Sequence, residues 1–389
     1  MPGPRIAIVS DTVDDINGVA IGLRRLVAAA TRAGHTASLV GPSGAITDEI
    51  VRIPAAMRAA LPFYAQMTWS VPELPALVAY LARSADLVQV ATPGPMGIAG
   101  LIAGRMLGLP VVAQYHTEVA EYAARMTGLP FVRGLVAPFV GWFYQQADRC
   151  LAPSQAVSDT LAALGVARIQ RIPRGVDLTL FDPARRDRAR LAALGVGDGP
   201  VALYVGRLSR EKNLDALAAA WTRVRADHAT ASLVVVGDGP YASALTGPGV
   251  IALGPRHGEE LAMIMASADV FAFPSETETF GNVVVEAAAS GLPVVVAAAG
   301  AAHEHVVDGV TGEVVAGGDP AALAAAIARP LDEPARRARM GAAARTHALG
   351  YDLDRAVRAT WAIYREVMDA HARGAHGATL VMPGLERAS

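Results

Sequence analysis

Two carboxylates, Glu278 and Glu286, bracket a polar turn in the segment 274–286, which reads PSETETFGNVVVE. The four apolar residues before this segment, 270–273, predict a short buried strand. Apolar residues at 283–289 predict a helix that begins near Phe280 and Gly281. The turn therefore joins the carboxyl end of a strand to the amino end of a helix, which is where ligands bind in open parallel sheets.

The expected helix start is suited to a phosphate group. Its first backbone N–H groups have no acceptor within the helix, and they lie at the positive end of the helix dipole. The carboxylates of Glu278 and Glu286 would repel a phosphate, but they can accept hydrogen bonds from hydroxyl groups. These groups together predict a ligand that combines phosphate with sugars. A solvated helix with an acidic first turn is the alternative interpretation.

The E-x7-E spacing stands ahead of the run A-x-x-S-G-L-P-V-V at 287–295. This combination resembles the retaining glycosyltransferases of family 4, which have the GT-B fold and use nucleotide sugars. The resemblance implies that Glu278 contacts the donor sugar and that Glu286 contacts the ribose of the nucleotide. It further implies that Phe280, Gly281 and Asn282 present their backbone N–H groups to the diphosphate.

A second turn, with two basic residues, follows the expected strand 200–205. Arg207 lies on this turn and Lys212 lies at the start of the next helix, where two cations beside helix N–H groups suit a diphosphate. The stretch resembles the family's G-R-L-x-x-x-K-N, in which both basic residues bind the diphosphate. Fixed charges stabilise a transition state where negative charge develops, so we expect these cations to replace a metal ion. No metal and no cofactor is expected.

The rare use of lysine and asparagine indicates further candidate site positions. Lys212 is the single lysine among 34 lysines and arginines, and asparagine occurs only at Asn17, Asn213 and Asn282. The heavy use of Ala and Arg is typical of GC-rich coding drift, which replaces lysine and asparagine where it can. We therefore expect these four positions to have roles that Arg or Asp cannot fill.

The first half of the chain begins with a βαβ pattern. A buried-type strand at 5–9 is followed by a polar loop, a helix that begins at Gly18, and a second strand at 36–40. The G-x-G-x-x-G dinucleotide pattern is absent from the turn. In the family, a glycine here lets the donor diphosphate approach the main chain. We assign that role to Gly18 and an acceptor contact to Asn17, with an ordinary tight turn as the alternative.

A histidine follows the expected strand 110–114. His116 begins the stretch His-Thr-Glu, which resembles the H-T-[DE] of members that transfer mannose or sulfoquinovose, where the histidine contacts the donor sugar near the reacting carbon. The stretch is most similar to bacterial GDP-mannose-dependent α-mannosyltransferases that act on glycolipids. We assign an acceptor contact to Glu118, and a solvated carboxylate is the alternative. His303 and His305 are too weak a pair to predict a metal site.

Two further segments are predicted from composition. Residues 51–80 mix small apolar, aromatic and proline residues, which suggests a loop or short helices. Residues 129–144 are strongly apolar with Arg133 as their one charge. A buried core helix is the first interpretation of that segment, and a surface that rests on a bilayer and admits a lipid acceptor is the alternative.

Composition excludes several classes of protein. A length of 389 residues suggests two domains, and a net charge of −2 argues against a nucleic-acid partner. Cys150 is the single cysteine, which fits a reducing compartment. The sequence shows neither a signal-peptide pattern nor a long apolar stretch. We expect a cytoplasmic protein, with peripheral contact at the inner face of the membrane.

The resemblance implies an α/β fold with two Rossmann-like domains that face each other across a cleft, and a C-terminal helix that crosses back to the N-terminal domain. We place an acceptor domain at 1–172, with the crossing helix at about 352–373. The donor domain is placed at 173–351, after a linker that begins IPRGVD at residue 172, and a loose tail at 374–389.

We predict a metal-independent retaining hexosyltransferase that moves mannose from GDP-mannose to an alcohol of a glycolipid or saccharide. A UDP-sugar-dependent glucosyl- or sulfoquinovosyl-type transferase is the alternative. A sugar-nucleotide epimerase, a glycoside hydrolase and a non-catalytic nucleotide-sugar binding protein are competing interpretations. Hydrolysis without a nucleotide would indicate the hydrolase, and donor consumption without an acceptor product would indicate the epimerase.

Overall fold

Runs of four or five buried apolar residues alternate with helices along both halves of the chain. The computed structural model describes residues 3–14, 18–44, 50–61 and 64–374. The chain divides into two compact units, one formed by Met1–Pro173 with Asp354–Ser389 and the other by Arg174–Leu353. Each unit has its own buried apolar core.

The first unit contains a parallel sheet of seven strands in the order β3-β2-β1-β6-β7-β8-β9. These strands are β1 (Arg5–Val9), β2 (Thr36–Pro42), β3 (Ile50–Ile53), β6 (Leu87–Val90), β7 (Val111–Gln114), β8 (Arg149–Ala152) and β9 (Ile169–Arg171). Its helices are α1 (Gly18–Arg32), α2 (Leu74–Ser84), α3 (Pro95–Met106), α4 (Val119–Thr127), α5 (Val132–Gln145), α6 (Gln155–Ala163) and α13 (Leu353–Ala372). The strand order reverses between β1 and β6, as in Rossmann-type sheets.

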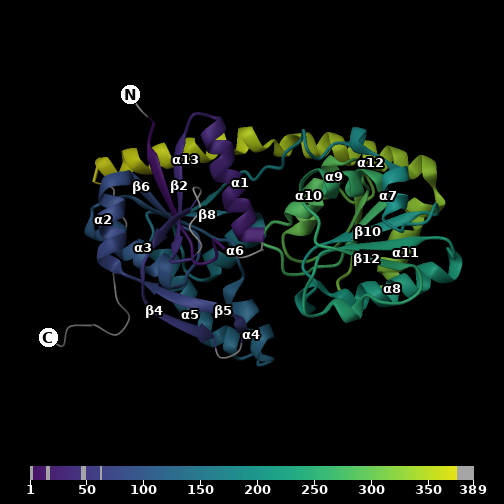
Figure 1. Cartoon of the computed structure of the whole chain (residues 1–389), viewed down its shortest axis with the longest axis horizontal. Helices are drawn as coiled ribbons and strands as arrows, with labels where there is room; N and C mark the ends of the chain where they lie inside the picture. The colour runs from purple at the N-terminus through teal and green to yellow at the C-terminus, as the bar shows by residue number, and fades with distance from the viewer. Residues whose placement is uncertain (1–2, 15–17, 45–49, 62–63, 375–389) are drawn as a thin grey trace. The chain divides into compact units, whose positions relative to one another are not determined.

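The C-terminal helix α13 packs on this first unit (Figure 1). Trp361 stacks on His35 with 4.9 Å between ring centroids. Tyr364 donates a hydrogen bond to the buried Gln89, whose amide nitrogen donates to Gln114. These contacts tie the helix to the end of α1 and to two strands of the sheet, which confirms that the C-terminal helix returns to the N-terminal half.

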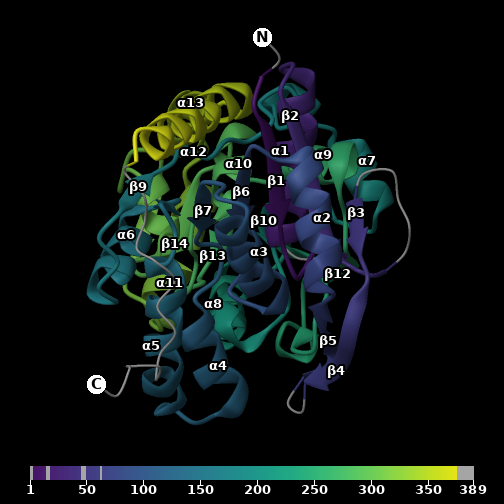
Figure 2. The same ribbon diagram turned by 90° about the vertical axis from the view of Figure 1, so that its left-hand side faces the viewer.

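The segment 51–80 differs from its predicted loop or short helices. It forms the end of β3, an antiparallel pair made by β4 (Ala55–Leu61) and β5 (Tyr64–Pro72), and then most of α2. The prediction of a loop or short helices was wrong because β4 consists mainly of small residues, so it lacks the β-branched side chains that usually indicate a strand. Figure 2 shows this hairpin at the same end of the unit as α4 and α5.

The segment 129–144 is not the buried core helix that its composition predicts. Within α5, the described buried residues are Val140, Gly141, Phe143 and Tyr144, all in its second half. Four large apolar side chains are exposed: Leu129, Phe131, Leu135 and Phe139, which we call the apolar patch. Composition could not show this, because exposure depends on which turns of the helix meet the sheet.

The second unit contains a parallel sheet of six strands in the order β12-β11-β10-β13-β14-β15. These are β10 (Val201–Val205), β11 (Ser232–Val236), β12 (Val250–Gly254), β13 (Val270–Phe273), β14 (Val294–Ala297) and β15 (Gly312–Val315). Its α-helices are α7 (Arg188–Ala193), α8 (Leu214–Asp227), α9 (Gly258–Ser267), α10 (Asn282–Ala289), α11 (Pro320–Asp332) and α12 (Pro334–Ala348). Figure 1 shows α8 and α11 on one face of the sheet, and α9, α10 and α12 on the other.

Among the described helices, none is both long and apolar enough to span a bilayer.

Candidate active site

The two motif loops of the second unit lie next to each other because their strands are neighbours. β10 pairs with β13 through Ala202 with Val270 and Leu203 with Phe271. The strand order reverses at this pair, since β11 lies on the other side of β10 and β14 on the other side of β13. Both loops leave the carboxyl ends of their strands at this switch point, where ligands of open α/β sheets bind.

Lys212 and Glu278, which come from the two loops, form an ion pair between Nζ and Oε1. The hydroxyl of Ser275 donates to the same carboxylate oxygen at 2.8 Å. The Lys212 and Glu278 side chains keep 18% and 17% of their surface exposed, so the pair is mostly shielded from water. The structure thus brings together two predicted site residues that are 66 positions apart in the sequence.

The pair controls the ionisation of Glu278. Burial alone would raise the pKa of this carboxyl, but the charge of Lys212 and the hydrogen bonds from Lys212 and Ser275 outweigh it and hold the pKa below its usual value. Glu278 is therefore a carboxylate near neutral pH. It can accept hydrogen bonds from hydroxyl groups, and Lys212 supplies a positive charge beside it.

Asn213 supports the same loops through its backbone and its side chain. Among the described residues it is the non-glycine residue with positive φ, at 56°, and it caps the start of α8. Asparagine is one of the few residues that adopt this left-handed conformation readily. Its side-chain nitrogen donates to Oε1 of Glu276 at 3.2 Å. An aspartate here would place a second carboxylate beside Glu276, so the amide of asparagine suits this contact.

The helix α10 begins where the sequence predicts. Gly281 is its N-cap in the left-handed conformation, with φ 90°, and Asn282 is its first residue. Phe280 is buried, and its ring lies under the guanidinium of Arg174. Glu286 lies one turn further along the helix and is also buried. The first N–H groups of α10 lie beyond the reach of intrahelical acceptors.

Arg207 lies at the start of the other loop. Its side chain is exposed, and its backbone oxygen accepts a hydrogen bond from the buried Tyr204 hydroxyl at 3.0 Å. The N–H of Leu208 donates to the carbonyl of Asp238, which follows β11. Asp238 therefore supports the loop through its backbone carbonyl. Arg207 is thus an exposed residue on the loop that follows β10.

The remaining predicted residues belong to the first unit. Gly18 is the first residue of α1, and Asn17 lies outside the described residues. His116 follows β7 and is 6% exposed. Glu118 precedes α4, where Tyr115 donates to its carboxylate at 3.0 Å. Burial and the charge of Glu121 raise the pKa of Glu118, although the Tyr115 hydrogen bond opposes them.

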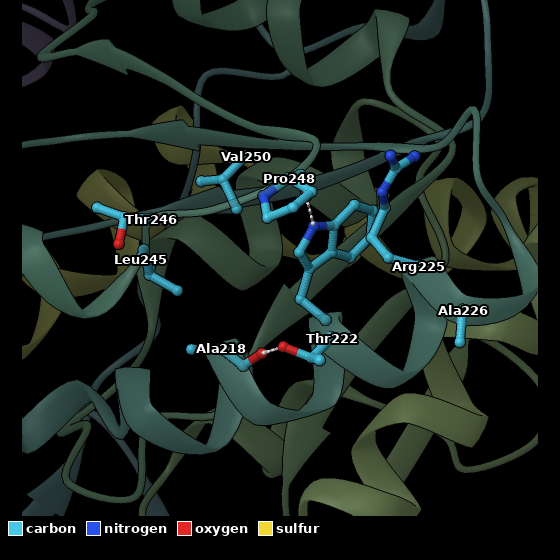
Figure 3. Close-up of a pocket in the computed structure, with 9 residues that line it drawn as sticks. Ala218, Thr222, Arg225, Ala226, Leu245, Thr246, Pro248 and Val250 are labelled. Carbon is cyan, nitrogen blue, oxygen red and sulfur yellow. Dashed lines mark hydrogen bonds between the residues drawn. The ribbon is translucent and has the colours of Figure 1, made fainter.

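A pocket of about 250 Å³ lies elsewhere in the second unit, between α8 and the segment that leads into β12 (Figure 3). Its lining contains none of the predicted site residues. The indole of Trp221 donates to the Pro248 carbonyl at 3.2 Å, and Arg225 donates to the carbonyls of His228 and Ala231. These bonds hold the end of α8, so the pocket belongs to the packing of that helix.

Within the described residues, no group of three or more His, Cys, Asp and Glu side chains is close enough to hold a metal ion. The described groups whose charge would suit a diphosphate are Lys212, Arg207 and the backbone N–H groups at the start of α10.

Known families match both halves of the chain. Residues 199–333 match a family described as glycosyl transferases group 1, and residues 16–180 match glycosyltransferase family 4. The chain is 34% identical over 325 residues to a GDP-mannose-dependent alpha-mannosyltransferase of Mycobacterium tuberculosis. This match covers 80% of this chain and 84% of that protein. The chain belongs to glycosyltransferase family 4.

The chain is also similar to other known proteins. The sulfoquinovosyl transferase of Arabidopsis thaliana is 32% identical over 304 residues, which is 75% of this chain and 59% of that protein. The solved structure of Anabaena HepE in complex with UDP has a TM-score of 0.73 at 22% identity, and the match covers 93% of this chain and 100% of that one. Such structural neighbours confirm the GT-B fold predicted for this family member.

Sequence reasoning missed several residues that support the site. Ser275 and Glu276 were not predicted, although both lie inside the segment 274–286, and they hold the loops together with Asn213, which residue usage had indicated. His305 contacts the carbonyl of Phe280. No local sequence signal indicates this role, because the contact depends on packing.

Proposed function

We propose that this family 4 glycosyltransferase moves a hexose from a nucleotide diphosphate sugar to an alcohol with retention of configuration. The observation that carries the proposal is the ion pair of Lys212 and Glu278 at the start of α10. The pair lies at the switch point of the sheet, which supports a role for Lys212 at the diphosphate and for Glu278 at the sugar.

The reaction follows from these groups. As the bond between the sugar C1 and the diphosphate oxygen breaks, negative charge develops on the leaving diphosphate. Lys212, Arg207 and the N–H groups of Gly281 and Asn282 would stabilise that charge. The acceptor oxygen bonds to C1, and its proton passes to the leaving phosphate. These fixed cations are the reason why we propose a reaction without a metal ion.

The proposed roles of the remaining residues follow the family resemblance. Glu278 would bind hydroxyl groups of the donor sugar, and Glu286 would bind the ribose. Gly18 would let the diphosphate approach, and His116 would contact the sugar near C1. Glu118 and Asn17 would contact the acceptor, so we assign the acceptor to the domain 1–172 and the donor to 173–351.

We propose mannose from GDP-mannose as the donor, because the relatives that are 34% identical include a mannosyltransferase that uses it. A UDP-sugar donor is the second candidate, supported by the similarity to a sulfoquinovosyl transferase and by the UDP bound to HepE.

The decisive experiment measures melting temperature with GDP, UDP and ADP, and then incubates the enzyme with GDP-mannose or UDP-glucose and candidate acceptors. We expect GDP to stabilise the protein most, and nuclear magnetic resonance of the product to show the anomeric configuration of the donor. Stabilisation by UDP alone would overturn the choice of GDP-mannose. Donor consumption without a product would indicate an epimerase or hydrolase, and activity lost in EDTA would contradict the metal-free reaction.

We also propose that the enzyme is cytoplasmic and works at the membrane surface on a glycolipid acceptor. The support is the apolar patch of Leu129, Phe131, Leu135 and Phe139, whose exposed rings and branched side chains suit a bilayer interface. Arg133 lies within this segment with 69% of its side chain exposed, and it could pair with anionic lipid headgroups.

A further inference from the structure

His305 lies directly behind the loop that carries Phe280. It ends the short 3₁₀ helix Ala302–His305, and it is 5% exposed. Its Nε2 is 2.7 Å from the backbone oxygen of Phe280, and its Nδ1 is 3.1 Å from the hydroxyl oxygen of Tyr351. Its ring also packs on the Phe280 ring, with 4.2 Å between centroids. The imidazole therefore joins the candidate diphosphate loop to the segment that precedes α13.

The two partners determine the tautomer of His305. The Phe280 carbonyl can only accept, so Nε2 carries the proton and donates it. In a neutral ring, Nδ1 then has a lone pair that accepts from the Tyr351 hydroxyl. The pKa of His305 is lowered to about 4, chiefly by burial; the Phe280 carbonyl and Glu304 oppose this change, and the nearby His347 and His303 add to it. The ring is neutral at pH 7, and both hydrogen bonds form together.

The bond to Phe280 also determines where the next N–H group points. A trans peptide unit is planar, and its C=O and N–H point in opposite directions. The peptide between Phe280 and Gly281 is trans, as are the others in the described residues. Because His305 holds the carbonyl of Phe280 inward, the N–H of Gly281 points away from His305.

We propose that His305 is a positioning residue for the donor diphosphate, because it orients the peptide that presents the Gly281 N–H to the ligand. This inference rests on the proposed function, since it deepens the role of the α10 start. Tyr351 acts in turn on His305, by fixing the tautomer that donates to Phe280. Neither side chain needs to touch the donor.

The neighbouring backbone supports the same loop. The N–H of Ala301 donates to the carbonyl of Glu278 at 2.9 Å. Gly300 has φ +62°, and a Cβ at this position would lie 2.8 Å from the Glu276 carbonyl oxygen, so only glycine permits the contact. The segment 300–305 therefore contacts the loop through the backbone of Gly300 and Ala301. His305 adds a side-chain hydrogen bond to the peptide before α10.

The test uses the full chain and compares four variants. His305→Leu removes both hydrogen bonds, whereas His305→Gln keeps an amide N–H that can reach the Phe280 carbonyl. Tyr351→Phe removes one hydroxyl. His347→Leu is the matched control, because His347 packs on Tyr351 with 5.7 Å between ring centroids but is not a partner of the Phe280 carbonyl. The readouts are melting temperature, the Kd of GDP and UDP by calorimetry, and the donor KM and kcat.

We expect His305→Leu to raise the Kd of the nucleotide about tenfold and to raise the donor KM more than it lowers kcat, since an aligned donor to a charged group is lost. His305→Gln should restore most of the affinity, and Tyr351→Phe should raise the Kd about threefold. His347→Leu should leave the Kd unchanged even where it lowers the melting temperature.

A Kd for His305→Leu equal to that of the wild type would overturn the inference and leave the proposed function intact. If His305→Leu does not fold, the inference is decided by Tyr351→Phe and His305→Gln: wild-type affinity in Tyr351→Phe together with lost affinity in His305→Gln would overturn it. A wild-type protein that binds neither GDP nor UDP would refute the proposed function first, and the inference with it.

Discussion

The sheet of the first unit has one strand more than that of the second, but both reverse their strand order after the first strand, and they differ at the edge where their strands end. In the second unit, the loops after β10 and β13 carry a shielded ion pair, Lys212 with Glu278. In the first unit, the segment after β7 leads to α4 and α5, where Phe131 and Leu135 are exposed. One topology thus provides two comparable edges, and the side chains placed there determine their chemistry.

The same comparison can be made between two single carboxyl groups, one from each unit. Glu278 and Glu118 both follow strands near the carboxyl edge of their sheets. The pKa of Glu278 is held low, since Lys212 and Ser275 outweigh burial. The pKa of Glu118 is raised, since burial and the charge of Glu121 outweigh the Tyr115 hydroxyl. A cation in the second unit accounts for the difference, and the following predictions test it.

The largest effect is expected from Lys212→Ala. Removing a fixed cation from the leaving group should lower kcat/KM by about 10²–10³-fold. The variant also leaves the carboxylate of Glu278 without its partner, which should cost about 1–3 kcal/mol of unfolding free energy. Steady-state kinetics and chemical denaturation measure the two effects separately. Wild-type turnover in this variant would refute the role assigned to Lys212.

The double variant Lys212→Ala with Glu278→Gln is the matched control for stability. A neutral amide at 278 no longer needs a counter-charge, so the double variant should recover much of the lost unfolding free energy but none of the activity. Equal instability in the single and double variants would mean that the ion pair contributes little to folding.

The apolar patch gives the corresponding prediction for the first unit. Phe131→Ser with Leu135→Ser should lower binding to vesicles of equal parts phosphatidylcholine and phosphatidylglycerol by about tenfold, because each side chain loses apolar area that would enter the interface. Both residues are exposed, so the melting temperature should be unchanged. Co-sedimentation measures the binding. Val310→Ser, at an exposed apolar residue of the second unit, is the control, and equal binding by all three proteins would refute a membrane role for the patch.

The sequence predicted the elements whose signals are local. The strands at 270–273 and 110–114 and the helix that begins at 282 appear within one residue of their predicted positions, because short apolar runs bounded by Gly, Pro and polar turns have few other arrangements. The proximity of Lys212 and Glu278 also agrees with the sequence pattern, because the two motifs follow neighbouring strands of one parallel sheet.

Features that depend on packing could not be predicted in this way. The hairpin of β4 and β5 lacks a clear alternation, and the exposure of Phe131 depends on which turns of α5 face the sheet. The bond from His305 to Phe280 joins residues that are 25 positions apart, and it depends on how the segment 300–305 lies behind the loop. No local pattern encodes such a contact.

A smaller effect is expected at Asn213, where the loop of the second unit depends on one backbone conformation. Asn213→Ala should lower the unfolding free energy by about 1–2 kcal/mol, because alanine tolerates a left-handed φ poorly. Asn213→Gly accepts that φ and loses only the bond to Glu276, so its cost should be smaller. Urea denaturation of the pair measures the difference. A glycine variant that is less stable than the alanine variant would contradict a conformational role.

The smallest effect concerns the opposite pKa changes of the two carboxyl groups. A carboxyl whose folded pKa is lowered contributes stability above its unfolded pKa and loses it as the pH falls, so Glu278→Gln should lower the melting temperature at pH 7 more than at pH 4. Glu118 has a raised pKa, so its ionisation costs stability as the pH rises above its unfolded pKa. Glu118→Gln should therefore raise the melting temperature at pH 7 and change it little at pH 4. Melting curves of both variants from pH 4 to pH 7 measure these changes in melting temperature. If both variants change the melting temperature in the same direction at pH 7, the electrostatic difference between the two edges is refuted.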